Sequence, residues 1–328
     1  QSIEISTVGG WLACRSAGQY STRYGKIEDM VVGVEAVTGA GSLLRTGGPP
    51  RAALGPDLTQ VLVGSEGTLA VITSATLRIH PTPTAERRAA FGFATFELGL
   101  DACRRILRRG ATPAVLRLYD ATESRRSYEQ NACVLLLLDE GDPAVVDAVM
   151  TIARQECEAT PTSVGLDAAL VGRWLAHRND LGALGQAVSQ GLVVDTVEVA
   201  APWARVPALY SSVIEEVRAL EGTVAVSAHC SHSYLDGTCL YFTFAGHVGD
   251  DLDRKDAYYL AAFGTATRAT IAAGGAIAHH HGVGLNRARF LGTALGDPAM
   301  HVLAGLKGIL DPAGILNVAT SALVSEVG

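Results

Sequence analysis

The sequence predicts an α+β protein, and two observations carry that prediction. Short runs of β-branched and small residues fill the first 80 positions, where long apolar helices are lacking. From about residue 88 onward, strand-like runs alternate with amphipathic segments whose apolar residues recur at helical spacing. Alternation of this kind, with antiparallel returns, indicates helices packed on a mainly antiparallel sheet.

The first part of the chain is expected to consist mainly of strands and loops. The clearest strands are 31–37 and 70–79, and residues 3–7 also resemble the middle of a strand. Pro81 and Pro83 then mark a boundary, because proline interrupts regular structure.

The middle of the chain repeats a strand–helix pattern. The expected strands are 90–94, 115–119, 134–138, 192–199, 224–227 and 239–244, and the expected helices are 96–109, 143–159, 202–220 and 256–273. Pro202 suits the first turn of its helix. After residue 285 we expect helices 286–295 and 300–310, followed by a turn at 311–314.

Composition excludes several classes of protein. The 328 residues are 48% hydrophobic, so a substantial core can form, and no apolar run is long enough to span a bilayer. A net charge of −7 argues against a nucleic-acid-binding protein. Six scattered cysteines without a CxxC pair, and no signal peptide, predict reduced thiols and a cytoplasmic location.

Three consecutive histidines, His279, His280 and His281, are the most informative motif. Glycines precede and follow them, so backbone can approach a ligand closely. In an extended chain only the first and third would face the same side, and no acidic partner is near in sequence, so a metal site is the weakest interpretation. Acid–base chemistry or cofactor contact is favoured, with purely structural histidines as the alternative.

Three glycine-containing stretches could cradle a phosphate or a flat heterocycle. The first runs from Thr7 through Gly9 and Gly10 to Ser16 and Gly18. The other two are 24–29 and 64–69. Each has an ordinary alternative, namely a turn, a polar loop before a strand, and a hairpin turn.

Arg117, Arg178 and Tyr241 are further candidates. Arg117 lies in an expected strand between two leucines that point the other way, so an inward guanidinium there needs an anionic partner. For both arginines the alternative is a surface ion pair, and for Tyr241 it is an aromatic core residue.

These motifs, in this order, resemble the FAD-linked oxidases of the vanillyl-alcohol-oxidase superfamily. More narrowly, they resemble the alkyldihydroxyacetonephosphate synthases (alkylglycerone-phosphate synthases), over essentially the whole chain. The flavin-domain likeness rests on 7–11, 24–32, 55–58 and 64–73, and the substrate-domain likeness on 114–120, 178–180, 195–203, 231–242, 279–281 and 310–317.

The resemblance implies a fold with three parts. Residues 1–84 would form the second half of the FAD-binding domain, with the first half absent from this chain. Residues 85–285 would form an α+β substrate (cap) domain with an antiparallel sheet. Residues 286–328 would return to the FAD domain.

The resemblance also implies roles. Tyr241 would be the acid–base residue, the three histidines would flank the flavin ring, Arg178 would bind a phosphate or carboxylate, and Arg117 would support the site. A phenol needs nearby positive charge to act as a base, which histidines and arginine could supply. The implied FAD contacts are Thr7, Gly9, Gly10, Ser16, Gly18, Tyr24, Gly25, Asp29, Val31, Glu66, Gly67, Leu69, Ile72 and Asn317, and no metal is implied.

In the synthases the flavin supports an exchange of a fatty acid for a fatty alcohol without net oxidation. Two departures favour a smaller or different substrate: Leu285 stands where the family carries a basic residue, and the stretch from Tyr119 to Cys133 is short. Oxidation of a 2-hydroxy acid or alcohol is therefore the alternative chemistry, and a non-catalytic fragment is a further one. The expected partners are a small substrate, anionic or lipid-like, and a second copy in a homodimer, with peripheral membrane contact allowed and nucleic acid excluded.

Overall fold

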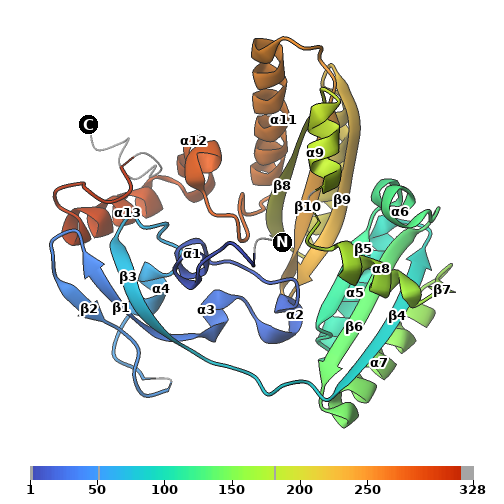
Figure 1. Cartoon of the computed structure of the whole chain (residues 1–328), viewed down its shortest axis with the longest axis horizontal. Coiled ribbons are helices and arrows are strands. Elements are labelled where there is room, and N and C mark those ends of the chain that lie inside the picture. The colour runs from blue at the N-terminus through green and yellow to red at the C-terminus, as the bar shows by residue number, and fades with distance from the viewer. Residues whose placement is uncertain (1–2, 51, 181, 319–328) are drawn as a thin grey trace. The chain divides into compact units, whose positions relative to one another are not determined.

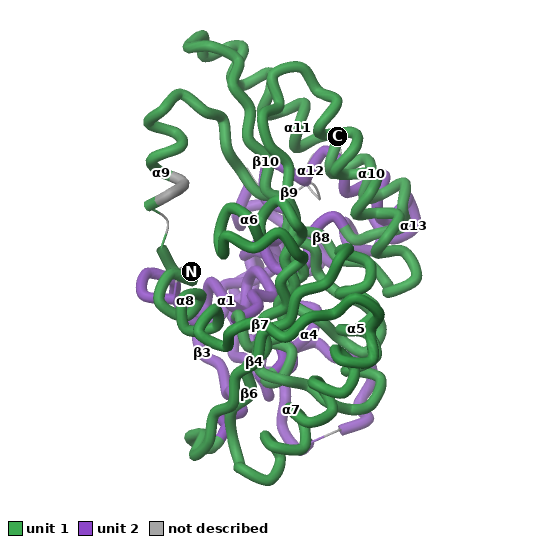
Figure 2. Tube along the Cα trace, turned by 90° about the vertical axis from the view of Figure 1, so that its right-hand side faces the viewer, with its two compact units in different colours: residues 1, 19–24, 81–276 green, residues 2–18, 25–80, 277–328 purple. Residues whose placement is uncertain are grey.

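The computed structural model describes residues 3–50, 52–180 and 182–318. These residues form two compact units (Figure 2), each of which is described by itself. Unit 1 comprises 19–24 and 81–276, and unit 2 comprises 3–18, 25–80 and 277–318. The expected domain boundaries followed residues 84 and 285, whereas the units change after residues 18, 24, 80 and 276.

Unit 1 is built on a seven-stranded sheet in the order β7-β4-β6-β5-β9-β10-β8, with every neighbouring pair antiparallel. Its strands are β4 (Ala85–Phe93), β5 (Val115–Tyr119), β6 (Cys133–Gly141), β7 (Val164–Leu166), β8 (Val193–Pro202), β9 (Thr223–Ser233) and β10 (Gly237–Gly246). Side chains alternate between the two faces of each strand, so the sheet presents two chemically different surfaces.

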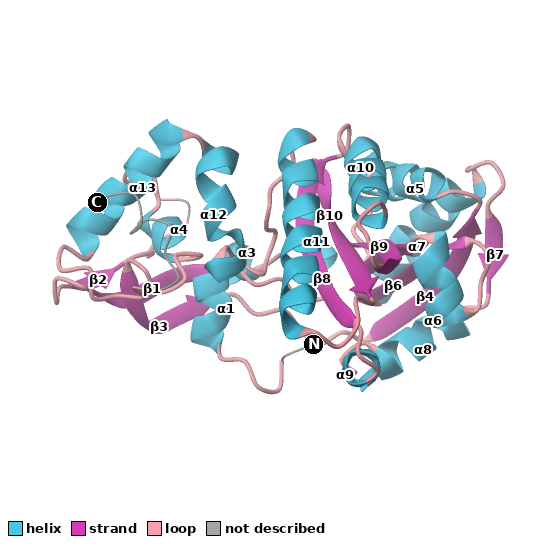
Figure 3. Cartoon of the chain, turned by 90° about the horizontal axis from the view of Figure 1, so that it is seen from above, coloured by secondary structure: helices cyan, strands magenta, loops and turns pink. Residues whose placement is uncertain are grey.

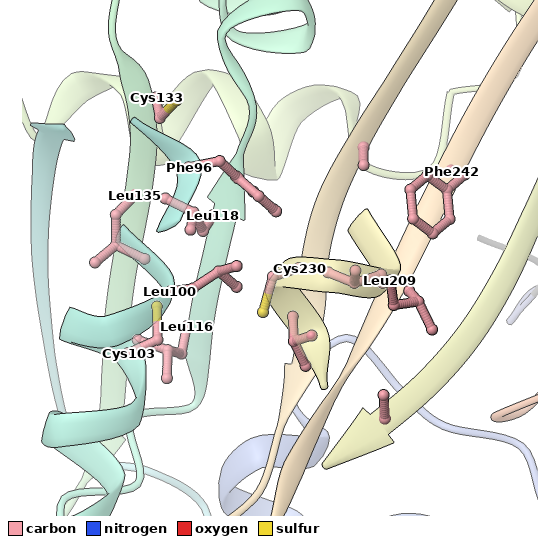
Figure 4. Packing of buried hydrophobic residues seen from close by; sticks show 14 of the residues in the cluster. Phe96, Leu100, Cys103, Leu116, Leu118, Cys133, Leu135, Leu209, Cys230 and Phe242 are labelled. Atoms are coloured by element: carbon pink, nitrogen blue, oxygen red, sulfur yellow. The ribbon is translucent and has the colours of Figure 1, made fainter. Parts of the chain in front are cut away.

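One face of this sheet carries the main hydrophobic core. Helices α5 (Phe96–Arg108), α7 (Pro143–Glu158), α10 (Val206–Arg218) and α11 (Leu252–Ala272) contribute to it. Figure 4 shows Phe96 and Leu100 of α5 beside Leu118 and Leu135, and Leu209 of α10 near Phe242. Removal of this apolar surface from water is the main source of the stability of unit 1.

The opposite face is only partly apolar. Helices α6 (Ala121–Tyr128) and α8 (Ala169–His177) pack there on a smaller cluster that includes Leu136, Leu138 and Trp174. The short helix α2 (Ser21–Tyr24) adds its tyrosine to that cluster. Helix α9 (Gly182–Ser189) precedes β8. The polar side chains on this face are described below.

The described residues of unit 2 form a three-stranded antiparallel sheet, β2-β1-β3, with five helices (Figures 1 and 3). The elements are α1 (Val8–Cys14), α3 (Ile27–Met30), β1 (Val31–Thr38), β2 (Leu43–Arg45), α4 (Leu58–Leu62), β3 (Ala70–Leu77), α12 (Gly284–Leu295) and α13 (Asp297–Leu310). Leu12, Ile27 and Leu62 are among the residues of its core.

Every strand and helix expected from residue 31 onward is present and in the expected order, but β2, α4, α6, β7, α8 and α9 were not expected. Several details were also wrong. Residues 3–5 form a turn, and the expected strand at 3–7 is replaced by this turn and by the approach to helix α1, which the side chain of Thr7 caps. Helix α10 begins at Val206 with Pro207 in its first turn, whereas Pro202 ends β8.

Strand β6 was expected to end at Leu138, before a run of acidic residues. It continues to Gly141 because the Asp139 carboxylate, which is fully buried, accepts hydrogen bonds from Arg23 (2.8 and 2.9 Å) and from the backbone N–H of Ala114 (3.0 Å). Paired in this way, a carboxylate can occupy an interior position.

The six cysteines, all of which lie in described ranges, keep their thiols and form no disulfide, as their spacing predicts. Within the described ranges, no helix combines the length and the apolar character that crossing a membrane requires.

Candidate active site

A row of functional side chains crosses four adjacent strands on the partly apolar face of the unit 1 sheet. The strand register pairs Tyr119 with His229, His229 with Tyr241, and Tyr241 with Glu198. Directly paired residues project on the same face of a sheet. Tyr119, His229, Tyr241 and Glu198 therefore form one continuous line, called here the polar row.

Arg117 joins the polar row from β5, two residues before Tyr119. Its Nε donates to the Tyr119 hydroxyl at 2.6 Å, and its Nη2 lies 2.6 Å from Nε2 of His229. The other ring nitrogen of His229, Nδ1, lies 3.0 Å from a carboxylate oxygen of Glu123 on α6. Arg117 is therefore linked to a carboxylate through His229, and the alternative of a surface ion pair was wrong.

Tyr241 is partly buried and belongs to the polar row, not to the hydrophobic core that holds Phe242 on the other face. Its ring stacks on that of His229, with centroids 5.1 Å apart and planes 12° apart. Thr196 donates to its hydroxyl at 3.3 Å.

Burial raises the pKa of Tyr241, and the carboxylate of Glu198 acts in the same direction. The phenol is therefore protonated near neutral pH. The expectation that surrounding positive charge makes it a base was wrong, because burial outweighs the effect of Arg117, the cation that lowers its pKa.

Arg178, at the end of α8, lies over two aromatic rings. Its guanidinium carbon is 5.1 Å from the ring centroid of Tyr20 and 5.5 Å from that of Trp174, and Nη1 donates to Gln19 at 3.3 Å. Trp174 also faces Arg117, at 5.8 Å, so one indole contacts both arginines. Among the residues that the structure describes, no carboxylate lies within ion-pair distance of Arg178, in contrast to the expected alternative of a surface ion pair.

The histidine segment lies in unit 2 and bends at each residue instead of running extended. The Nδ1 atoms of His279 and His280 are 2.9 Å apart, and the rings of His280 and His281 have centroids 4.6 Å apart. The expected alternation, with His280 facing away from the other two, was therefore wrong. Bends let all three imidazoles cluster.

Two cations hold this segment. Lys26 donates to the carbonyl of His279 at 2.7 Å, and the buried Arg287 donates to the carbonyls of Ile277 (2.7 Å) and Gly282 (3.3 Å). The segment is thus tied down at its start, middle and end. Arg287 is the basic residue that follows Leu285, and its guanidinium binds backbone of its own chain.

The three imidazoles are neutral near pH 7. Burial, together with the charge of Lys26, lowers the pKa of His279 to about 3, and burial with the charge of Arg287 lowers the pKa of His281 to about 4. Burial also holds the pKa of His280 well below its ordinary value. The expectation that these histidines supply positive charge was therefore wrong, and they are hydrogen-bonding groups instead.

The first predicted flavin stretch is a helix followed by a loop. Thr7 accepts from the N–H of Gly10 at the start of α1, so Gly9 and Gly10 are helical, and the loop proper is 15–18. Arg15 fastens this loop by donating to the carbonyls of Val63 (3.0 Å) and Gln60 (2.7 Å). The carbonyl of Ser16 accepts from the N–H of residue 27.

The second stretch is divided between the units. Tyr24 belongs to unit 1, where its hydroxyl donates to Glu140 at 2.9 Å. Gly25 and Asp29 belong to unit 2, and Asp29 accepts from the N–H of Lys26 at 2.8 Å. Gly25 has φ +78°, and a Cβ there would lie 2.7 Å from that of Asp29, so this turn requires glycine.

The third stretch is a turn between α4 and β3, not a hairpin. Glu66 has φ +52°, and its carboxylate accepts from the N–H groups of Val283 (2.6 Å) and Gly284 (2.9 Å) at the start of α12. The amide of Asn317 donates to the Glu66 carbonyl. Glu66 therefore links this turn to the end of the histidine segment.

The remaining predicted flavin residues either pack in or beside the core of unit 2 or are loop glycines. Leu69 is buried in the unit 2 core, whereas Val31 and Ile72 are partly buried beside it, in β1 and β3. Gly18 and Gly67 lie in the loops, and a Cβ at either would meet no atom within 4 Å.

Sequence reasoning missed Glu123, His229, Trp174 and Lys26 as candidates. A signal existed for His229, because its neighbours in the chain are the apolar residues 228 and 230, which face the main core. Strand alternation then places His229 on the opposite face. Glu123 and Trp174 gave no comparable signal, since they lie on helices whose packing face depends on the sheet.

Comparison with known proteins agrees with this architecture. Residues 82–319 match the family described as FAD linked oxidases, C-terminal domain, and residues 1–47 match an FAD binding domain. The chain is 33% identical to the FAD-linked oxidoreductase YgcU of Escherichia coli K12, over 98% of this chain and 69% of that protein.

Alkyldihydroxyacetonephosphate synthases are also similar. That of Dictyostelium discoideum is 30% identical over 96% of this chain and 56% of its own length. A solved structure of an alkyldihydroxyacetonephosphate synthase superposes with a TM-score of 0.74 at 27% identity, covering 95% of this chain and 58% of that one. The chain thus spans little more than half of each synthase. Because the first family match alone covers more than half of the chain, the protein belongs to the FAD-linked oxidases, and its cofactor is FAD.

Proposed function

We propose that the protein is an FAD-dependent enzyme that acts on a small anionic substrate by the exchange reaction of the alkyldihydroxyacetonephosphate synthases. The observation that carries the proposal is Arg178, a guanidinium held over Tyr20 and Trp174 with no carboxylate partner among the described residues. A guanidinium placed in this way suits a phosphate or carboxylate, which it can bind through two parallel N–H groups.

Several glycine positions of unit 2 fit FAD. Gly9, Gly18 and Gly67 each border open space where a Cβ would stand, so a ligand can approach the backbone there. When bound, FAD supplies the redox-active ring at which the substrate carbon reacts. The residues proposed to hold it are Thr7, Gly9, Gly10, Ser16, Gly18, Tyr24, Gly25, Asp29, Val31, Glu66, Gly67, Leu69, Ile72 and Asn317.

In this proposal the chain's own residues bind the substrate and move a proton. Arg178 binds the anionic group, and Arg117 supports the polar row. Tyr241 is protonated, so its hydroxyl first donates to the substrate oxygen and then recovers the proton. The neutral imidazoles of 279–281 donate and accept hydrogen bonds beside the flavin.

A second candidate is oxidation of a 2-hydroxy acid or alcohol. It is favoured by the segment after the histidines, where Leu285 is 67% exposed and the next cation, Arg287, is committed to backbone carbonyls. A carboxylate carries a single charge, and one guanidinium can bind it through two parallel N–H groups.

The two candidates are separated by two assays on the FAD-loaded protein. The exchange assay supplies an acyl dihydroxyacetone phosphate with radiolabelled hexadecanol and measures ether product. The oxidation assay adds glycolate or D-lactate without oxygen and follows flavin absorbance in the visible range. Ether product without bleaching supports the exchange, bleaching alone supports the oxidase, and neither leaves the non-catalytic alternative.

A further inference from the structure

Glu123, His229 and Arg117 form a chain of three side chains from three different elements, α6, β9 and β5. The contacts are 3.0 Å from the Glu123 carboxylate to Nδ1 of His229 and 2.6 Å from Nε2 of His229 to Nη2 of Arg117. A guanidinium has donors only, so Nε2 must be the acceptor and must lack a proton. The remaining proton then lies on Nδ1, which donates to Glu123.

Charge and burial agree with this assignment. Glu123 and His229 are each 6% exposed. Although burial by itself raises it, the pKa of Glu123 is held below its ordinary value by His229, Arg126 and Arg117. Burial and the charge of Arg117 lower the pKa of His229. The chain is therefore an ionised carboxylate, a neutral imidazole and a guanidinium.

An imidazole bonded at both nitrogens cannot rotate about its Cβ–Cγ bond without breaking a hydrogen bond. Its face is therefore fixed, and that face stacks on Tyr241 with planes 12° apart. The same imidazole aligns Arg117, which also binds Tyr119 and faces Trp174. Through one ring, the Glu123 carboxylate thus sets the orientation of both the phenol and the guanidinium.

We propose that Glu123 and His229 are positioning residues for catalysis: they hold Tyr241 and engage Arg117, which leaves Arg178 as the cation that takes the substrate's anionic group. The proposal rests on the proposed role of Tyr241. It predicts that disturbing Glu123 lowers kcat while the KM for an anionic substrate is retained, because Arg178 is untouched. Arg178→Ala should show the opposite pattern.

Asp120 offers a matched control. It is also a buried carboxylate at the start of α6, 2% exposed, but it caps the helix and accepts from the N–H of Ala228 at 2.7 Å and from Tyr210 at 3.4 Å. It makes no contact with His229 among the hydrogen bonds of the described residues. Asp120→Asn should therefore lower stability without changing kcat.

The first arm of the test needs no substrate. Holoenzyme labelled with ¹⁵N-histidine is examined by two-bond ¹H–¹⁵N correlation NMR across the neutral pH range, and His229 is assigned by its loss in His229→Gln. We expect a neutral ring with its proton on Nδ1 throughout this range. A proton on Nε2, or a charged ring at neutral pH, overturns the proposal.

The second arm measures kcat and KM of Glu123→Gln and Asp120→Asn, with melting temperature and bound flavin recorded for each. Glu123→Gln keeps an acceptor for Nδ1–H of His229 but removes its negative charge, and the loss of this charge-assisted hydrogen bond predicts a fall in kcat of about tenfold or more, with KM within about twofold of wild type. An equal loss of kcat in Asp120→Asn, or unchanged kcat in Glu123→Gln, refutes the positioning role. Glu123→Asp, which keeps the charge but shortens the side chain, replaces Glu123→Gln if the latter does not fold.

Failure of the proposed function is distinguishable from failure of this inference. If the wild-type protein turns over neither substrate class, the proposed function fails, and the NMR arm still decides whether His229 has the tautomer that the inference requires.

Discussion

Arg178→Ala is the most informative single substitution in unit 1. The guanidinium lies over the rings of Tyr20 and Trp174 and donates one long hydrogen bond, of 3.3 Å, to the side chain of Gln19. Truncation leaves no buried carboxylate without a partner among the described residues. The fold should therefore survive, with a loss limited to cation–π contacts worth about 0.5–1 kcal/mol each at exposed sites.

The expected effect on substrate binding is larger. A hydrogen bond between charged partners contributes about 1.5–3 kcal/mol, and about 1.4 kcal/mol corresponds to tenfold in affinity. Removing Arg178 should therefore raise KM for an anionic substrate by about 10- to 150-fold. The value of kcat should change little, because Arg178 binds a group remote from the reacting carbon.

The assay compares steady-state kinetics of the FAD-loaded wild type, Arg178→Ala and a matched control, Arg173→Ala. Arg173 lies earlier, on α8, and makes an exposed 3.7 Å ion pair with Glu129, so its removal should leave KM unchanged. An unchanged KM in Arg178→Ala, or an equal rise in Arg173→Ala, would refute the assignment of Arg178 to the substrate anion.

Three other predictions concern the scaffold. Arg23→Met leaves the fully buried Asp139 without its ion-pair partner, so urea titration should show a free energy of unfolding lower by about 3–5 kcal/mol. A loss under about 1 kcal/mol would contradict this account. Residue 25 has φ +78°, and Gly25→Ala would place a Cβ 2.7 Å from the Cβ of Asp29. We therefore expect less bound FAD per protein, measured by visible absorbance. Full FAD content would argue against this turn as a cofactor contact. His279 has a pKa of about 3 when folded and about 6.5 when unfolded, so its contribution to stability is present above pH 6.5 and is lost as pH falls towards 3. Unfolding curves at about pH 5 should therefore show a loss of about 1–2 kcal/mol in the free energy of unfolding, and His279→Gln should lack this loss. An equal loss in His279→Gln would count against the depressed pKa.

Periodicity located most of the fold because the relevant signals are local. The short, mostly apolar run 115–119 placed β5 to the residue, and the amphipathic pattern of 96–109 located α5 within one residue. Elements whose stability comes from tertiary contacts were not predicted from the sequence. Helix α6 is highly polar and is stabilised by Asp120 as its cap and by packing on the sheet, neither of which is visible in a periodic pattern.

The candidate site likewise contains residues that the sequence could identify and residues that it could not. Arg117 could be singled out because an arginine between two leucines of a strand is chemically unusual, but Glu123, to which His229 links it, lies on a separate element that only the folded chain brings near. The protonation of the histidines could not be inferred from sequence, because burial and the charges of Lys26 and Arg287 set it.

The most direct test of the central claim is the turnover of Tyr241→Phe compared with wild type, on protein whose flavin spectrum shows equal FAD content. The phenol is the proposed proton donor, and general acid catalysis contributes about 10²–10⁴-fold, so the account predicts a kcat lower by at least about 100-fold with the flavin spectrum unchanged. A Tyr241→Phe enzyme that retains wild-type kcat would contradict the role of Tyr241 and, with it, the proposed chemistry of the polar row.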